Sequence, residues 1–499
     1  MKKFLTKELL ALYLIIAVGL FLRVQGIFTN SFAFTYDVGR DMLAVNDIVH
    51  LGKIPLIGQT TGLPGLFYGP WWYYILTVPF ILSSGNPAGI VFFMALSGVA
   101  SVFFGFKLGK NIGGTTLGLI LASLLSFSPV MVGLASQIWN PNLIPLFVII
   151  FMYCLHLIFV SLERKKNIGI MPLFFLGLML GIILDSEVVF GSLFLVGAII
   201  SIFILVGKKL KLKDYLFAFL GFLLILLPRA IFDLRHKFLM TNTLLYFARN
   251  IFPSTHGNNS LFAPSNSIVS LFNLWLGTLS NGNWLLGIIL IFFVIFSIIF
   301  YRKKLEKKEK SLLLFSLITI AVFLIGLSFF PGAIWDHYIV GVPVLYIFIL
   351  SIAFLKVLQN FKLPVILIFI ALLLFYVNPI RIINEWGKPL WEGDASVYRN
   401  QLAVADYVYK QANGKDFNYV LYTPPVHDYT YKYLFSWYGK NRYGYAPKIG
   451  KASLFFLIME PDYQYPFRLT DWLKERKNDG KIVKEEVSKG NVTIQTRIH

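Results

Sequence analysis

Long apolar runs separated by short polar segments dominate the chain between residues 8 and 378. Each run holds about 18–20 residues, enough for an α-helix to cross the hydrocarbon core of a bilayer. The short alternating segments typical of a membrane β-barrel are absent from the sequence. The pattern therefore predicts a polytopic α-helical membrane protein. About 11 transmembrane helices are expected, at residues 8–27, 87–107, 114–135, 142–161, 168–185, 188–207, 214–229, 284–301, 311–330, 338–357 and 363–378.

Basic residues set the expected orientation of these helices. Twenty of the 45 Lys and Arg residues lie in six short segments beside or between the apolar runs. The positive-inside rule places such segments in the cytoplasm. With the N-terminus inside, an odd number of spans in the cytoplasmic membrane puts residues 379–499 outside. The net charge of +20 is thus a topology signal, and no nucleic acid is expected as a partner.

The first apolar run follows a basic start, MKKFLTK, as it would in a signal peptide. The run is longer than the apolar region of a signal peptide, which usually holds about 7–15 residues. No small-residue cleavage site follows it. We therefore expect a first helix that is retained.

A short apolar segment, PWWYYILTVPFILSS at residues 70–84, does not fit the series of spans. Pro79 interrupts it, and its Trp and Tyr residues favour the headgroup level of a membrane. We interpret it as an interfacial segment. The first external loop then runs from about residue 28 to 86, and the second long external loop from about 230 to 283.

The C-terminal part of the chain, residues 381–499, alternates between segments of helical and of strand character. This alternation predicts a small extracytoplasmic α/β domain after a transmembrane domain at residues 1–380. The expected helices lie near residues 397–412, 429–439 and 468–477, and the expected strands near 418–425, 452–460, 481–487 and 491–498.

Candidate catalytic residues lie in FTYDVGRDMLAVNDI, residues 34–48, directly after the first apolar run. Asp37 and Asp41 are four residues apart, so they share one face if the segment is helical. Such a face offers a general base and a supporting carboxylate or metal ligand, with Arg40 as an ion-pair partner. The alternative is a solvated interfacial helix with acidic residues in its first turns. The residues alone leave both interpretations open.

Cationic residues on the same side of the membrane are candidates for binding a phosphate. Arg suits bidentate contacts with phosphate, and His can bind phosphate or metal. The alternatives are a side chain that reaches to the headgroups and a structural hydrogen bond. The candidates are Arg229, Arg235, His236 and His337, with Asp233 as the expected partner of one arginine. A cavity for donor or acceptor is expected to include Tyr68, Trp71, Tyr73, Trp139, Asn140, Glu187 and Tyr338.

Several of these segments together resemble a known family. They are YDVGRDMLAVNDI, GKIPLIGQTTGLPGLFYGPWWYYIL, SQIWNPN and FDLRHKF. Over roughly residues 8–380 the chain resembles the membrane glycosyltransferases of the C-type fold, GT-C. It is most similar to the family 39-like enzymes, which include protein O-mannosyltransferases and the lipid A aminoarabinose transferase. The resemblance implies the GT-C fold for residues 1–380.

The resemblance also implies roles for the candidate residues. It makes Asp37 the catalytic base and Asp41 its helper, and it assigns the donor phosphate to the four basic candidates named above. The family commonly has Asp-Glu where this chain has Asp37-Val38, which removes one candidate metal ligand. The only cysteine, Cys154, lies within an apolar run. No metal site is therefore assigned, and a divalent metal stays an open alternative as cofactor.

The implied activity is inverting transfer of a sugar from a polyprenyl-phosphate donor to a lipid, glycan or protein acceptor. It takes place at the outer face of the cytoplasmic membrane, whose lipids are the other expected partners. The alternative is a transporter or flippase of lipid-linked saccharides, which needs a phosphate site but no base. Transporters often place polar groups near the bilayer midplane. Here such groups gather at one face, which favours the enzyme.

Overall fold

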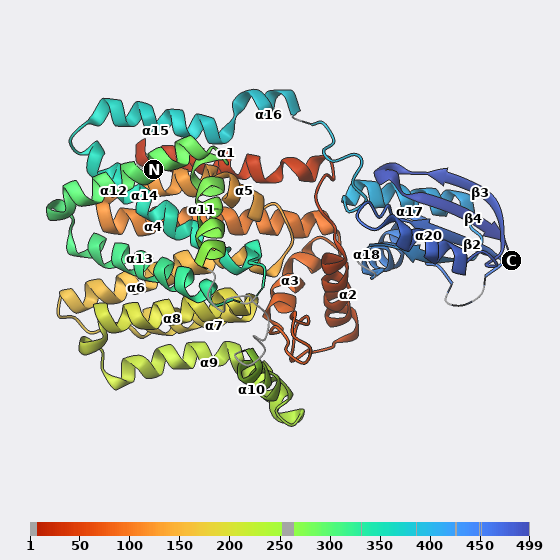
Figure 1. Ribbon diagram of the computed structural model, residues 1–499, viewed down its shortest axis with the longest axis horizontal. Coiled ribbons are helices and arrows are strands. Elements are labelled where there is room, and N and C mark those ends of the chain that lie inside the picture. Colours follow the sequence, from red (N-terminus) through yellow and green to blue (C-terminus); the bar gives the residue numbers. More distant parts are fainter. Residues whose placement is uncertain are drawn as a thin grey trace, which may run out of the picture.

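A computed structural model describes residues 7–251, 264–330, 332–385, 387–424, 427–448, 450 and 452–498. A bundle of long helices carries a small α/β domain at one end (Figure 1). We call this end of the bundle the domain end and the opposite one the far end. The bundle contains α1 (Lys7–Phe28), α2 (Tyr36–Leu51), α3 (Trp71–Leu82), α4 (Pro87–Phe127), α5 (Pro129–Leu134), η1 (Asn140–Leu143), α6 (Ile144–Glu163), α7 (Ile170–Ser186), α8 (Val188–Leu205), α9 (Leu212–Arg235), α10 (Leu239–Ile251), α11 (Pro264–Ser280), α12 (Trp284–Tyr301), α13 (Lys307–Ser328), η4 (Asp336–Ile339), α14 (Val342–Leu358), α15 (Lys362–Val377) and α16 (Pro379–Glu385).

Within the described residues, eight helices are long and apolar enough to cross a membrane. Three shorter apolar helices, α3, α7 and α14, accompany them. Outward-facing apolar side chains cover most of α9, α12 and α15, as expected of helices that contact lipid. The polytopic α-helical membrane fold predicted from the apolar pattern is therefore confirmed. The number of 11 spans stays a prediction.

Helix α4 consists of two antiparallel arms, which correspond to two predicted spans. Gly113 and Gly114 have non-helical dihedral angles and form the turn between the arms. The arms approach closely, because a Cβ atom at Gly109 would lie 2.8 Å from the Gly118 Cα. Glycine at these positions lets the two backbones touch.

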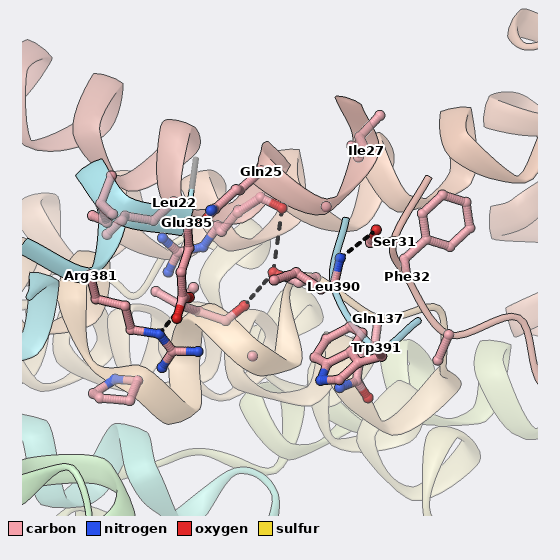
Figure 2. Close-up of a pocket in the computed structure, with 18 of the residues that line it drawn as sticks. Leu22, Gln25, Ile27, Ser31, Phe32, Gln137, Arg381, Glu385, Leu390 and Trp391 are labelled. Atoms are coloured by element: carbon pink, nitrogen blue, oxygen red, sulfur yellow. Dashed lines mark hydrogen bonds and ion pairs between the residues drawn. The ribbon is translucent and has the colours of Figure 1, made fainter. Parts of the chain in front are cut away.

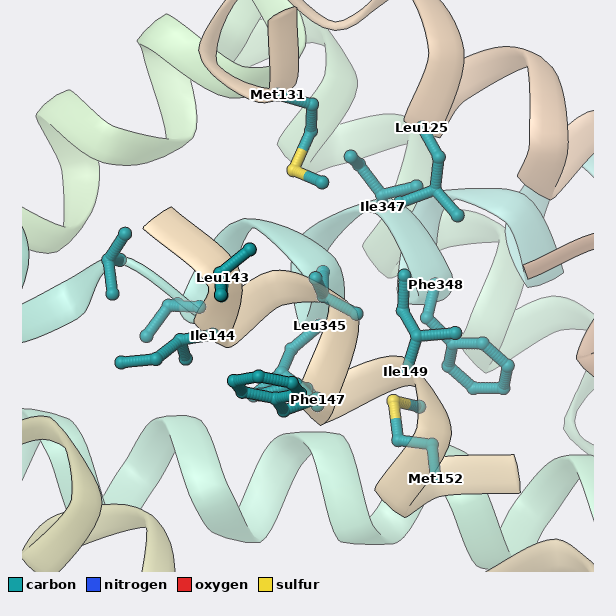
Figure 3. Packing of buried hydrophobic residues seen from close by; sticks show 14 of the residues in the cluster. Leu125, Met131, Leu143, Ile144, Phe147, Ile149, Met152, Leu345, Ile347 and Phe348 are labelled. Carbon is teal, nitrogen blue, oxygen red and sulfur yellow. The ribbon is translucent and has the colours of Figure 1, made fainter. Parts of the chain in front are cut away.

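The core of the bundle is built around α14, in which every residue from Val342 to Lys356 is buried. Figure 3 shows its side chains packed against residues of α4, α5 and α6. Because all of its faces are buried, α14 lies in the middle of the bundle, away from both water and lipid. This central helix fixes the positions of the helices that carry the polar residues at the domain end.

The far end of the bundle contains the turns rich in Lys and Arg, and its acids pair with these lysines. Glu309 binds Lys356 at 2.7 Å, and both side chains are buried. Three looser pairs lie among the same turns, Lys110–Glu8 at 3.8 Å, Lys307–Glu163 at 4.0 Å and Lys308–Glu306 at 3.2 Å. Three of these pairs, Glu309–Lys356, Lys110–Glu8 and Lys307–Glu163, join different helices.

The C-terminal domain has a four-stranded sheet of order β1-β2-β4-β3, in which β1 and β2 are parallel and the other neighbours antiparallel. Its helices and strands are α17 (Tyr398–Ala412), β1 (Phe417–Tyr422), α18 (Tyr429–Leu434), α19 (Lys440–Tyr443), β2 (Leu454–Met459), α20 (Pro466–Glu475), β3 (Lys481–Val487) and β4 (Thr493–Ile498). All of them overlap predicted segments except α19, which follows the helix predicted at residues 429–439. The boundary at residues 380 and 381 stays a prediction.

This domain packs directly on α2 (Figure 1). A Cβ atom at Gly39 in α2 would lie 2.5 Å from the backbone nitrogen of Thr430 in α18, so the two helices touch through their backbones. Phe34 is bound from both directions, because its N–H donates to the Ser396 carbonyl at 2.8 Å and its carbonyl accepts from Gln401 Nε2 at 3.1 Å. The domain is therefore fixed against the helix that carries the candidate base.

Candidate active site

The predicted catalytic carboxylates lie on α2, at the domain end of the bundle. Asp37 is in the first turn of this helix, and Asp41 follows one turn later. Arg40 binds both, with Nη1 donating to Asp37 Oδ1 at 2.6 Å and Nη2 donating to Asp41 Oδ1 at 2.8 Å. The structure thus contains the expected ion pair, and a single guanidinium orients both carboxylates.

Asp41 is closed off from solvent. Its side chain is 2% exposed, and its second oxygen, Oδ2, accepts a hydrogen bond from Trp72 Nε1 at 2.7 Å. Burial raises the pKa of Asp41 to about 6, because the cost of desolvation outweighs the attraction of Arg40. Since both oxygens are engaged, Asp41 is placed to hold Arg40 rather than to meet a ligand.

Asp37, in contrast, forms part of the wall of a cavity of about 400 Å³. Its side chain is 27% exposed, so one face of the carboxylate is open while the other binds Arg40. Trp139, predicted for the ligand cavity, lies in the same wall. The C-terminal domain supplies the opposite wall, with Ser396, Gln401, Thr423, Thr430 and Glu460. A ligand in this cavity would lie between α2 and the C-terminal domain.

Two residues predicted for the cavity, Tyr68 and Glu187, bind each other. Glu187 lies in the turn between α7 and α8, and its Oε2 accepts a hydrogen bond from the Tyr68 hydroxyl at 2.9 Å. Burial raises the pKa of Glu187 to about 7. The pKa of Tyr68 is also raised, by burial and by the negative charges of Glu187 and Asp37. This pair therefore belongs to the electrostatic surroundings of Asp37. Asn140 lies beside it and donates to the Ser186 carbonyl.

His337 and Tyr338 lie in η4, next to the cavity wall. The His337 ring is 5.0 Å from the Trp139 ring and 4.5 Å from the Tyr338 ring, measured between centroids. Because Trp139 also lines the cavity of Asp37, the structure brings His337 to the edge of the site. Of the four predicted phosphate ligands, His337 is the one that contacts a described residue of the cavity wall, Trp139.

Arg229 is held in an ion pair rather than left free. Its Nε lies 3.0 Å from Asp185 Oδ1, and both side chains are largely buried. The backbone of the Gly-rich loop packs directly against the same carboxylate, because a Cβ atom at Gly69 would lie only 1.8 Å from Asp185 Oδ1. Gly69 directly follows Tyr68, so the Arg229 pair lies next to the Tyr68–Glu187 bond.

Arg235 and His236 are exposed at the end of α9. The His236 ring stacks on Phe232 at 4.0 Å. Asp233 was expected to pair with an arginine. Instead it accepts the backbone N–H groups of Met240 and Thr241 and caps α10, because free N–H groups at a helix start need acceptors. No ion pair or hydrogen bond between described residues joins Arg235 or His236 to Asp37, and the basic candidates with described contacts have different partners.

The aromatic residues of α3 lie beside the helix that carries Asp37. Trp71 Nε1 donates to the Ile225 carbonyl at 2.7 Å, and Tyr73 is buried beside Arg40. Neither residue lines the cavity of Asp37, and their place in a cavity for donor or acceptor stays a prediction. The interfacial interpretation of this segment is incomplete, because α3 packs its Trp72 and Tyr73 side into the bundle against α2 and α4.

A second, larger cavity of about 560 Å³ adjoins the first (Figure 2). The two share wall residues Ala33, Gln137 and Ser396. Figure 2 shows Leu22 and Gln25 of α1 on one side of it and Arg381, bound to Glu385 at 2.8 Å, on another. The second cavity thus lies between α1, α5 and the α15–α16 segment.

A metal ion would need several ligand side chains close together. Within the part of the chain that the structure describes, no group of three or more His, Cys, Asp or Glu residues could hold a metal ion. Asp37 and Asp41, the nearest candidates, already share the Arg40 guanidinium. We therefore derive no step through a metal.

Neither family models nor curated proteins match this sequence. Solved structures do match. The crystal structure of ArnT from Cupriavidus metallidurans bound to undecaprenyl phosphate aligns over 97% of this chain and 97% of that chain, with a TM-score of 0.57 and 11% identity. The apo state of ArnT aligns over the same shares, with a TM-score of 0.56 and 10% identity. The chain has the GT-C fold.

The fold implied by the sequence resemblance is therefore confirmed. An oligosaccharyltransferase from Archaeoglobus fulgidus, in complex with Zn and sulfate, aligns over 85% of this chain and 57% of that chain. Its TM-score is 0.48 and its identity 14%.

Sequence reasoning missed the residues that the C-terminal domain adds to the site of this GT-C chain. Gln401, Thr423 and Glu460 were assigned no role, although all three line the cavity of Asp37. The one signal available was an acidic residue at the end of the apolar strand ASLFFLIME. A polar residue directly after a buried strand is a common position for a ligand contact.

Proposed function

We propose that this GT-C protein is an inverting glycosyltransferase that moves a sugar from a polyprenyl-phosphate donor to an acceptor hydroxyl. The observation that carries this proposal is the contrast within α2. Asp37 is open to a cavity while Asp41, one turn away, is buried and engaged on both oxygens. ArnT, which has the same fold, is bound to undecaprenyl phosphate in one of its structures, and this supports the same class of lipid carrier here.

The residue types suit this chemistry. An acceptor hydroxyl is a weak nucleophile until a base takes its proton. In the proposed step, the acceptor oxygen forms a bond to the anomeric carbon while its proton passes to Asp37. The bond from the anomeric carbon to the phosphate oxygen breaks at the same time, and the polyprenyl phosphate leaves with the electron pair. A single displacement of this kind inverts the anomeric configuration.

The leaving phosphate needs cations or hydrogen-bond donors rather than an acid. His337 beside Trp139 and Arg229 beside the Tyr68–Glu187 pair are the proposed donor-side groups. Arg235 and His236, at the exposed end of α9, are the proposed outer contacts with phosphate as it approaches from the membrane. Tyr338, adjacent to His337, completes this side of the site.

The proposed orientation puts the far end of the bundle in the cytoplasm. The turns at that end carry the Lys- and Arg-rich segments, which the positive-inside rule assigns to the cytoplasmic side. Asp37 and the C-terminal domain then face the outside of the cytoplasmic membrane. The acids lie near the bilayer because the lipid of the donor is anchored in it.

The test is turnover by the full chain in lipid nanodiscs. Labelled polyprenyl-phosphate sugars of several kinds are supplied with a membrane extract as the source of acceptor. We expect turnover by Asp37→Asn to be about 10²–10⁴-fold slower than by the wild type, with donor binding retained in the variant. Asp47→Asn is the matched control, since Asp47 lies on the same helix but binds Lys53 at the surface.

Two results would overturn the proposal. Turnover by Asp37→Asn at the wild-type rate would show that Asp37 is not the general base. Binding of a donor by the wild type without any turnover would instead favour a transporter of lipid-linked saccharides.

A further inference from the structure

The C-terminal domain presents two polar residues side by side at the ends of its parallel strands. Thr423 directly follows β1, and Glu460 directly follows β2. Because β1 and β2 are parallel and in register from Phe417 to Tyr422, these residues leave the sheet at the same edge. The Thr423 hydroxyl donates to Glu460 Oε2 at 2.6 Å. The ends of parallel strands are where α/β folds usually place their ligands.

This edge of the sheet faces the catalytic helix. Thr423 and Glu460 line the same cavity of about 400 Å³ as Asp37. The close packing of Gly39 on Thr430 fixes the distance between α2 and the domain. Glu460 is 8% exposed, so it is an almost buried carboxylate whose remaining access is through this cavity.

A third residue of the same wall has an unused hydrogen-bond acceptor. Gln401 is 2% exposed, and its Nε2 is used to donate to the Phe34 carbonyl at 3.1 Å. Its Oε1 is buried and has no hydrogen-bond partner among the residues that the structure describes. A buried carbonyl oxygen without a partner costs free energy, which a ligand with a suitable donor group would recover.

The wall therefore offers acceptors to whatever enters the cavity. When Glu460 is ionised, its carboxylate and the Gln401 carbonyl can only accept, and the Thr423 hydroxyl already donates to Glu460. Such a wall selects a ligand that carries several donor groups close together. Neighbouring hydroxyls of a sugar ring have this property, whereas a phosphate or a carboxylate would be repelled.

We propose that Glu460, with Thr423 and Gln401, forms a binding site for the polyhydroxylated head group of the acceptor, held across the cavity from Asp37. Glu460 accepts hydrogen bonds from two hydroxyls of that group and turns a third hydroxyl toward the base. This inference rests on the proposed function for its purpose, but the site itself can be measured without turnover.

The experiment uses methyl β-D-glucoside as the probe and the full chain in nanodiscs, with binding followed by saturation-transfer NMR. We expect the wild type to bind the probe and Glu460→Gln to weaken this binding about tenfold or more, because a charge-assisted hydrogen bond is lost. Glu475→Gln, a matched substitution at an exposed position of α20 in the same domain, should leave the affinity unchanged. Thr423→Val serves as a second variant, which loosens the carboxylate without removing it.

Kinetics then separate this site from the donor site. With any donor and acceptor that the wild type turns over, Glu460→Gln should raise the KM for the acceptor and leave the KM for the donor unchanged. A variant that is merely destabilised would lose active enzyme, and hence kcat, without this split.

The results distinguish the two proposals. If Glu460→Gln and Thr423→Val both bind the probe as tightly as the wild type, the acceptor site is wrong while the transferase proposal stands. Equally tight binding of the fully O-methylated glucoside by the wild type would also overturn the site, because that molecule has no hydroxyl donors. The protein could also bind the glucoside in a way that depends on Glu460 and yet turn over no donor. This result would support the binding site and contradict the transferase proposal.

Discussion

The two ends of the helix bundle hold their carboxylates in different ways. At the far end, Glu309 is 1% exposed and its partner Lys356 4% exposed, so the pair is sealed inside the protein. At the domain end, Asp37 binds Arg40 at a similar distance but keeps 27% of its side chain open to a cavity. An ion pair alone therefore does not separate a structural acid from one that is proposed to react, such as Asp37. What separates them is whether one face of the carboxylate can still meet a ligand.

The largest effect that would test this comparison is on turnover. Asp37→Asn should lower the rate by about 10²–10⁴-fold, because the acceptor hydroxyl loses its general base. Thermal unfolding should stay unchanged, since Arg40 keeps its bonds to Asp41. Initial rates and apparent Tm, measured on the same nanodisc sample, check both statements. A large fall in Tm would instead show that Asp37 has a structural role, like the buried pair of Glu309 and Lys356.

The second effect concerns the far end of the bundle, where we expect a loss of stability without a change in the KM values. Glu309→Gln leaves Lys356 buried without its counter-charge, which typically costs about 3–5 kcal/mol. Denaturant unfolding should show this loss, while the KM values of the folded protein stay the same. Glu163→Gln is the control, because its pair with the exposed Lys307 is long and should contribute about 0–1 kcal/mol. Changed KM values in Glu309→Gln would contradict a purely structural role.

A smaller effect sharpens the comparison within α2. Trp72→Phe removes the hydrogen bond to Asp41 Oδ2, and a hydrogen bond to a charged group contributes about 1.5–3 kcal/mol. We expect a measurable loss of stability and a moderate fall in turnover, because Asp41 no longer holds Arg40 as firmly. Parallel measurement of both quantities decides the role of Asp41. Turnover as low as that of Asp37→Asn would show that Asp41 takes part in the chemistry itself.

The last expected effect is on the pH dependence of stability. Burial, together with the negative charge of Asp394, raises the pKa of Glu460 to about 7, although the Thr423 hydroxyl lowers it. The folded protein thus holds this proton more tightly than the unfolded chain, whose carboxyl has a pKa near 4.5. The resulting stabilisation is complete at pH values below 4.5 and is lost as the pH rises through about 7. Glu460→Gln should therefore show a flatter fall of apparent Tm over this range than the wild type. An unchanged slope would contradict the shift.

The sequence predicted those features that depend on local pattern. Apolar runs predicted the helices, and alternation predicted the strands of the C-terminal domain. The spacing of Asp37, Arg40 and Asp41 predicted their common helix face. The family resemblance predicted the GT-C fold, which the similarity to ArnT bears out.

Features that depend on distant partners were not predictable in this way. The burial of Asp41 needs Trp72 from α3, and the pairing of Arg229 needs Asp185 from α7. Glu460 enters the site only because β2 lies parallel to β1 and because the domain packs on α2. Register between strands and docking between domains are long-range properties that no local spacing encodes.

The contact of Gly39 with Thr430 also bears on how such a protein can be modified. Because the C-terminal domain meets α2 through bare backbone, no larger residue fits at Gly39 without separating the two. Exchange of the whole domain for that of a relative would therefore need a matching surface on α2, and most chimeras should assemble poorly. Substitutions at Thr423 and Glu460, directly after β1 and β2, do not touch this contact. If these residues bind a ligand as proposed, its preference is expected to change through single substitutions there rather than through exchange of the domain.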